Sequence, residues 1–196
     1  MTYRKNRWWM SLAAMTLLAA AAGCARSTKD ASSSADKAKP AGSTLPAADS
    51  ALPPAPAVSF QNLQGQTETL AQYRGKVVLV NFWATWCEPC RQEMPELIAL
   101  QNEYGNKGFT VLGIAMDQSG KSAVAPFVAQ REFKVGDKEQ KLNYPIVLGN
   151  DDIATKFGGL FGLPTSFLIT KNGRIETKVI GMIDYSGMKQ LIQKSL

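Results

Sequence analysis

The sequence predicts a mixed α/β sheet in which parallel crossover units come first and an antiparallel hairpin comes last. Apolar β-branched runs alternate with segments whose apolar residues recur at helical spacing. The run 76–82 (KVVLVNF) is almost continuously apolar, as in a strand that is buried on both faces of a sheet. Asn172-Gly173 is a strong signal for a tight hairpin turn, so the last two strands should pair antiparallel.

The predicted order is β-α-β-α-β-α-β-β-α, preceded by a short hairpin. The first long helix turns Leu97, Ile98 and Leu100 inward, and Gly105 ends it. The charged stretch 134–142 (KVGDKEQKL) is predicted to be a surface loop. The predicted elements are hairpin strands 58–60 and 67–70, strands 76–82, 109–116, 144–148, 165–170 and 175–180, and helices 88–104, 122–133, 153–157 and 185–196.

Composition divides the chain into three parts. Residues 1–23 begin with basic residues and continue in an uncharged apolar run of about 15 residues, shorter than the roughly 20 that span a bilayer, so they indicate a cleaved secretory signal. Residues 24–56 are rich in Ala, Ser, Pro, Asp and Lys, which predicts a disordered, flexible tether. Residues 57–196 are long enough for one folded domain.

Cys24 ends the apolar run, after small residues. This pattern resembles the lipobox of bacterial lipoproteins, whose cysteine receives a diacylglyceryl thioether and an acyl chain after cleavage; Ala21 stands where that pattern prefers leucine. Lipidation at Cys24 would anchor the protein stably to a membrane, since two or three acyl chains are enough. The alternative is an ordinary secretory signal with a stray cysteine.

The basic excess of the chain is partly an export signal. The net charge is +6, and removing residues 1–23 takes away three basic and no acidic residues, which leaves +3. The rest of the chain has no basic cluster with interleaved aromatic residues. Nucleic acid is therefore not expected as a partner.

Two of the three cysteines, Cys87 and Cys90, lie in the run 82–95 (FWATWCEPCRQEMP). A structural zinc site needs four ligands, but the chain has no histidine and its third cysteine lies at the export signal, so a metal is disfavoured. A disulfide that closes so short a loop removes little entropy from the unfolded chain, so it would stabilise the fold poorly. The pair therefore favours thiol–disulfide exchange.

The two sulfurs are expected to have different roles. A strand ending near Trp83 delivers Cys87 to the N-terminus of the next helix, where backbone N–H groups and the helix dipole favour an anion. Cys87 is then the attacking thiolate, and Cys90, one turn later and more covered, resolves the mixed disulfide. Pro89 early in the helix costs no hydrogen bond and stiffens the loop between the sulfurs.

The run 80–95 (VNFWATWCEPCRQEMP) together with Leu163-Pro164-Thr165 resembles the TlpA/ResA-like family of membrane-anchored thioredoxin-fold thiol-disulfide oxidoreductases. The resemblance covers about residues 57–196. It implies a thioredoxin-like mixed sheet flanked by helices, with an N-terminal β-hairpin extension. No cofactor beyond the dithiol is expected.

The resemblance also assigns expectations to single residues. Pro164 matches the family's cis-proline beside the cysteines, and the backbone of Leu163 would pair with an extended substrate segment. The alternative for Pro164 is a proline that simply starts a strand. Pro95 matches the helix-kinking proline of the fold.

Glu93 is the carboxylate that the resemblance singles out. In ResA-like members a glutamate at this position is thought to modulate cysteine ionisation, and a carboxylate is a suitable proton carrier in a chain without histidine. The alternative is an ordinary solvated glutamate. Asn81 stands where many thioredoxins carry a buried aspartate, which favours Glu93 for the proton. Glu88 is expected to be exposed.

Trp83 and Trp86 come four residues and one residue before Cys87. They would form an apolar rim on which the partner's cysteine segment docks, or they would simply pack against the sheet.

The predicted function is an extracytoplasmic reductant, on the periplasmic side in a Gram-negative cell. The resemblance implies electrons from a transmembrane thiol donor, and clients with cysteine pairs such as apocytochrome c or copper-site proteins; a monomer is expected. The direction of exchange depends on the reduction potential, which the sequence does not give. The alternatives are a thioredoxin-fold thiol peroxidase, which would use one reactive cysteine, and a non-catalytic metallochaperone, which would need His or closely placed Met ligands.

Overall fold

The computed structural model describes residues 51–196. The predicted signal (residues 1–23), Cys24 and most of the predicted tether lie outside the described residues. None of the helices in the described part of the chain is long and apolar enough to cross a membrane.

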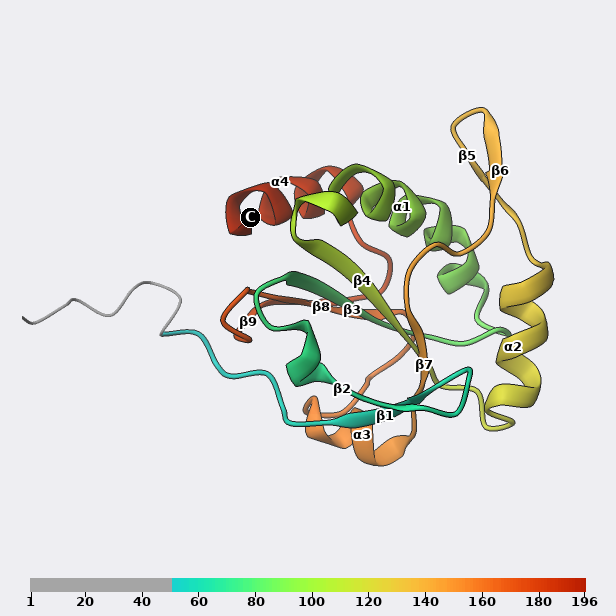
Figure 1. The fold of residues 1–196 in the computed structure, drawn as a ribbon, viewed down its shortest axis with the longest axis horizontal. Helices are drawn as coiled ribbons and strands as arrows, with labels where there is room; N and C mark the ends of the chain where they lie inside the picture. Colours follow the sequence, from blue (N-terminus) through green and yellow to red (C-terminus); the bar gives the residue numbers. More distant parts are fainter. Residues whose placement is uncertain (1–50) are drawn as a thin grey trace, which may run out of the picture. The chain divides into compact units, whose positions relative to one another are not determined.

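A seven-stranded sheet organises the domain, in the order β2-β1-β7-β4-β3-β8-β9 (Figure 1). β3 and β4 pair in parallel at the centre, β8 pairs antiparallel on the other side of β3, and β9 forms an antiparallel edge. The parallel-first, antiparallel-last order is therefore confirmed. The strands are β1 (Ser59–Asn62), β2 (Thr67–Thr69), β3 (Val77–Trp83), β4 (Phe109–Ala115), β7 (Ile146–Leu148), β8 (Thr165–Ile169) and β9 (Ile175–Ile180).

Helices cover both faces of the sheet, because the central strands are apolar on both sides. All seven residues of β3 are buried, as the continuous apolar run predicts. Leu79 faces α1 and α4, whereas Val80 faces α3 and the short helix η2. Figure 1 shows α1 and α4 above the sheet and α3 below it. The helices are η2 (Leu70–Tyr73), α1 (Glu88–Tyr104), α2 (Lys121–Gln130), α3 (Asp151–Lys156) and α4 (Tyr185–Ser195).

The stretch predicted as a surface loop is a second, two-stranded sheet. β5 (Phe133–Val135) pairs antiparallel with β6 (Lys138–Gln140) around a turn in which Gly136 has φ of +61°. The loop prediction for residues 134–142 is therefore wrong, and the preceding helix ends at Gln130 rather than at Phe133. Phe133 is buried against the core, and that contact accounts for a hairpin whose other residues are mostly charged.

The folded domain begins earlier than the predicted boundary after residue 56. The carbonyl of Pro53 accepts a hydrogen bond from the N–H of Ile175 (2.8 Å), and the N–H of Ala55 donates to the carbonyl of Gly173 (2.9 Å). Residues 53–55 are thereby attached to the β8–β9 turn, so the prediction that they belong to a flexible tether is wrong.

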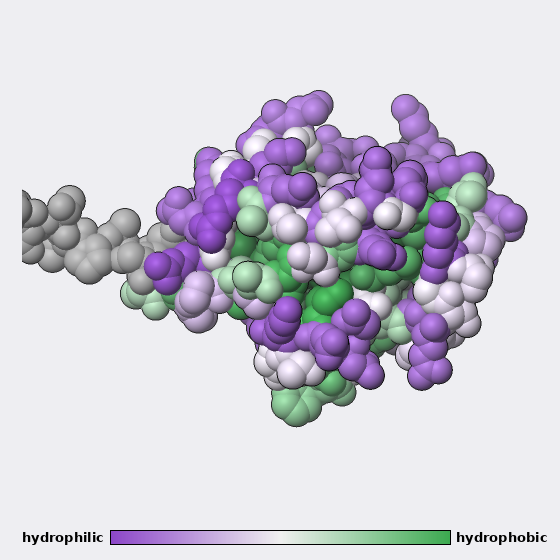
Figure 2. Space-filling view, turned by 60° about the horizontal axis from the view of Figure 1, so that its bottom comes forward, coloured by the Kyte–Doolittle hydropathy of each residue, from purple (hydrophilic) through white to green (hydrophobic). Residues whose placement is uncertain are grey.

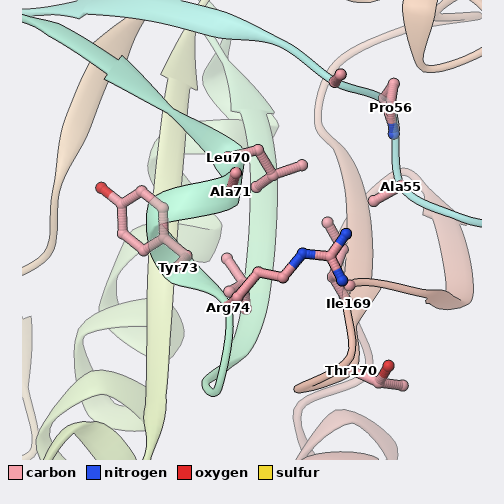
Figure 3. A pocket seen from close by; sticks show the side chains of 11 residues that line it. Ala55, Pro56, Leu70, Ala71, Tyr73, Arg74, Ile169 and Thr170 are labelled. Carbon is pink, nitrogen blue, oxygen red and sulfur yellow. The ribbon is translucent and has the colours of Figure 1, made fainter.

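A small hollow lies beside this attachment, between η2 and the end of β8 (Figure 3). Arg74 extends across it from η2 toward Ile169 and the segment that carries Ala55 and Pro56. The volume of this hollow is about 100 Å³.

Candidate active site

Cys87 is the N-cap residue of α1, and a disulfide joins it to Cys90 (S–S 2.02 Å). The N–H of Cys90 donates to the Cys87 sulfur (3.3 Å), so the sulfur takes the place that a capping oxygen usually has. Pro89 stands in the first turn, where its missing N–H costs nothing. The predicted placement of both cysteines at the helix N-terminus is confirmed.

The loop between β3 and α1 is held from two sides through Thr85. The N–H of Thr85 donates to both carboxylate oxygens of Asp117 (3.1 and 3.2 Å), and its hydroxyl donates to one of them (2.5 Å). The guanidinium of Arg91 donates to the Thr85 carbonyl (3.1 Å). Cys87 therefore follows a loop with a fixed backbone.

Sequence reasoning missed Asp117, although a signal for it exists. β3 and β4 are parallel and Trp83 pairs with Ala115, so residues that directly follow the two strands meet at one edge of the sheet. Asp117 comes two residues after β4 and is only 6% exposed. A buried acidic residue at that edge is a candidate for positioning the redox loop.

Glu88 lies on the surface between the two cysteines, as predicted. Its side chain is 59% exposed and forms an ion pair with Arg91. An exposed pair of this kind contributes little to stability.

Glu93 is buried one turn after Cys90, with 1% of its surface exposed. Its two oxygens accept hydrogen bonds from the N–H of Ile183 (2.6 Å) and from the side-chain amide of Asn81 (2.8 Å). Burial raises the pKa of Glu93 from 4.5 to about 7, although both hydrogen bonds act to lower it and the charge of Glu96 raises it further. The alternative of a solvated glutamate is therefore wrong.

Asn81 connects Glu93 to the sheet. Its amide also donates to the hydroxyl of Ser166 on β8 (2.9 Å), and its neighbour on β4 is Gly113. A Cβ atom at position 113 would lie 2.6 Å from Ile146 and 3.0 Å from the Trp83 indole nitrogen, so a larger residue there would displace the Ile146 side chain. The three polar side chains Glu93, Asn81 and Ser166 thus form a buried chain beneath the redox helix.

The two tryptophans have different environments. Trp83 is 1% exposed and its ring packs 5.4 Å from that of Phe127, so the prediction that it contributes to an exposed rim is wrong. Trp86 is 67% exposed. Trp86, Leu160 and Leu163 are among the residues that line an open hollow of about 400 Å³.

The peptide bond between Leu163 and Pro164 is cis, as the resemblance implied. Pro164 accepts a hydrogen bond from the N–H of Gly181 (2.9 Å). Within residues 51–196 no such partner is found for the N–H or carbonyl of Leu163. The Leu163 side chain packs against the large apolar cluster to which both cysteines belong.

A comparison with protein families matches residues 53–178 to the AhpC/TSA family. The chain belongs to that family. One relative is the thiol-disulfide oxidoreductase ResA of Bacillus cereus, which is 34% identical to this chain over 143 residues. The matched residues cover 71% of this chain and 75% of that protein. ResA of Geobacillus thermodenitrificans is 33% identical over 139 residues, 71% of this chain and 74% of that protein.

Solved structures agree with the fold and the activity. A thiol:disulfide interchange protein of the thioredoxin family from Chlorobium tepidum TLS matches with a TM-score of 0.61 and 28% identity, over 74% of this chain and 96% of that one. This AhpC/TSA family member is therefore a thioredoxin-fold thiol-disulfide oxidoreductase of the ResA type. The resemblance found in the sequence is confirmed.

The raised pKa of Glu93 predicts a pH-dependent stability. The folded protein holds this proton more tightly than the unfolded chain, so the stabilisation is present below pH 4.5 and is lost as the pH rises through 7. A shift of this size corresponds to about 3 kcal/mol. The free energy of unfolding of the oxidised protein, measured with urea, should fall between pH 5 and pH 8. The fall should reach up to this amount in the wild type and be much smaller in Glu93→Gln.

The control for this prediction is Glu132→Gln, which changes an exposed glutamate in the same way. It should keep the pH dependence of the wild type. An equal fall in the wild type and in Glu93→Gln would show that Glu93 is ionised in the folded protein at pH 5.

Proposed function

We propose that this protein reduces disulfides of client proteins at the extracytoplasmic face of a bacterial membrane. The observation that carries the proposal is the Cys87–Cys90 disulfide across the first turn of α1, with Cys87 as the cap. Backbone N–H groups at this position stabilise a thiolate more than a thiol, which makes Cys87 the nucleophile after reduction.

The exchange needs two attacks. The Cys87 thiolate attacks a client disulfide, forms a mixed disulfide with one client sulfur and displaces the other as a thiolate. Cys90 then loses its proton and attacks the Cys87 sulfur, which releases the second client thiolate and closes the Cys87–Cys90 disulfide. Two electrons have moved to the client, and a donor dithiol restores the reduced pair by the reverse steps.

Glu93 is suited to accept the proton of Cys90. It lies three residues later on α1, so both side chains occupy the same side of the helix. With a pKa of about 7, both protonation states of Glu93 are populated at neutral pH, as a general acid–base group requires.

The client segment docks between Trp86 and Leu163. The unpaired backbone of Leu163 supports pairing with an extended strand, and the exposed indole of Trp86 supports an apolar contact beside the client cysteine. The client class, a protein with a cysteine pair such as an apocytochrome c or a copper-site protein, follows from the ResA likeness, as do the transmembrane thiol donor and a monomeric state.

The location rests on the N-terminal sequence. Residues 1–23 have the pattern of an export signal, and Cys24 has the position of a lipidated cysteine. The protein is then tethered through Cys24 on the periplasmic side in a Gram-negative cell.

The two cysteines should differ when each is replaced by serine. Cys87→Ser should lower the rate of insulin disulfide reduction at least a hundredfold, because the nucleophile is gone. Cys90→Ser should accumulate mixed disulfides with clients, because Cys87 still attacks but nothing resolves the adduct. Non-reducing gels and mass spectrometry detect the trapped adducts.

Equal trapping by both variants would contradict these roles. A peroxide-consumption assay with a thiol donor separates the proposal from a thiol peroxidase. A peroxide turnover faster than insulin reduction would favour the peroxidase.

Cys24 should be the site of acylation. Cells grown with labelled palmitate should incorporate the label into the wild type and into Cys87→Ser, but not into Cys24→Ala. Unlabelled wild type, or equal label in Cys24→Ala, would remove the tether from the proposal.

A further inference from the structure

Six basic side chains gather at the end of the sheet that lies opposite the disulfide, and we call this group the basic pole. Backbone hydrogen bonds bring its segments together: Gly75 donates to Lys171 and Val77 donates to Gly108, each at 2.9 Å. The side chain of Arg74 donates to the carbonyl of Asn172. The basic pole consists of Arg74, Lys76, Lys107, Lys171, Arg174 and Lys194.

The carboxylates near the basic pole are Glu176 and Glu103, and the charge of Lys107 acts on Glu103. Glu176 lies in the same region, and its carboxylate accepts a hydrogen bond from the hydroxyl of Ser195 (2.5 Å). The ammonium of Lys171 donates to the backbone oxygen of Leu196. The salt bridges found within residues 51–196 are Glu88–Arg91 and Glu103–Lys189, and neither involves the basic pole.

Acidic side chains predominate at the opposite end of the sheet, which holds the disulfide, although Arg91 and Lys121 also lie there. Carboxylates gather at the start of the helices there, where the helix dipole favours negative charge. The seven residues of β3 separate the two ends by about 20 Å at 3.3 Å per residue. The acidic side chains at this end are Glu88, Glu96, Asp117, Asp151, Asp152 and Asp184.

The chain that leads toward Cys24 leaves the domain at the basic pole. The guanidinium of Arg174 donates to the carbonyl of Leu52 (2.9 Å). Leu52, Lys171 and Lys194 are among the residues that line an open hollow of about 390 Å³. Hydrophilic side chains are prominent on the surface next to the point where the described chain begins (Figure 2).

We propose that the basic pole docks on anionic lipid headgroups and thereby holds the disulfide on the side of the domain that faces away from the membrane. The proposal rests on the tethered location under the proposed function, because a tether raises the effective concentration of the domain at the membrane. Basic residues near an anionic bilayer are attracted to it electrostatically, and salt screens this attraction. Docking presents Trp86 and Leu163 to clients in solution.

Vesicle sedimentation tests the basic pole without the lipid anchor. The protein is residues 24–196 with Cys24→Ser, and the vesicles contain phosphatidylcholine alone or with 30% phosphatidylglycerol. The protein should bind the vesicles with phosphatidylglycerol at low salt, leave them at 0.5 M NaCl and ignore phosphatidylcholine. The double variant Lys76→Glu, Lys194→Glu should bind at least tenfold more weakly.

A matched control is Lys138→Glu, Lys141→Glu, which changes the net charge equally at exposed positions in and next to β6. It should bind within twofold of the parent protein. An equal loss of vesicle binding in the two double variants would show that only net charge matters, and it would overturn the proposal. The proposal would also be overturned if the parent protein did not bind, or if it bound equally to vesicles of phosphatidylcholine alone.

The orientation of the docked domain is tested by the rate at which its disulfide is reduced. A water-soluble phosphine should reduce the Cys87–Cys90 disulfide at the same rate, within twofold, on vesicles and in solution. A rate at least tenfold lower on vesicles would show that the disulfide faces the membrane and would overturn the proposal. These assays do not depend on client reduction or on acylation, so failure of the proposed function would show separately in the insulin and palmitate experiments.

Discussion

The whole site depends on a fixed junction between a buried strand and a helix. β3 is buried on both faces and pairs with a neighbour on each side, so its end at Trp83 cannot shift without disrupting the core. A short loop, clamped at Thr85 by Asp117 and Arg91, then places Cys87 as the cap of α1. Because this position is fixed, the sulfur lies where converging N–H groups favour its ionised form.

A buried polar chain beneath the helix complements this junction. A carboxylate inside an apolar layer is unfavourable when it is ionised, and Glu93 is only partly compensated by its two hydrogen bonds. Asn81 holds one Glu93 oxygen and is itself anchored on Ser166, so three separate parts of the sequence fix one proton-binding group. Burial makes ionised Glu93 unfavourable for stability at high pH. The same burial allows Glu93 to exchange a proton at neutral pH.

The local features of the fold could be read from the sequence because their causes are local. An apolar β-branched run predicted β3, and the spacing of the cysteines with Pro89 placed them at the start of α1. The burial of Glu93 could not be derived in this way, because a glutamate on a helix looks the same whether or not Ile183 and Asn81 cover it.

Long-range features escaped prediction for the same reason. Asp117 contacts Thr85 across 32 positions, and the basic pole is assembled from segments that only the sheet brings together. Residues 53–55 have the composition of a tether, yet they pair with a turn about 120 positions later. The β5–β6 hairpin has charged residues on its exposed side, and the buried Phe133 and the partly buried Val135 attach it to the core.

The most direct test of the account is the reactivity of the two thiols in the fully reduced protein as the pH is varied. Iodoacetamide modification, followed by peptide mapping, gives a separate rate for Cys87 and for Cys90. The account predicts that Cys87 titrates below the ordinary thiol pKa of about 8.5 and is modified at least tenfold faster than Cys90 at pH 6.5. Equal rates, or faster modification of Cys90, would contradict the claim that the helix N-terminus activates Cys87.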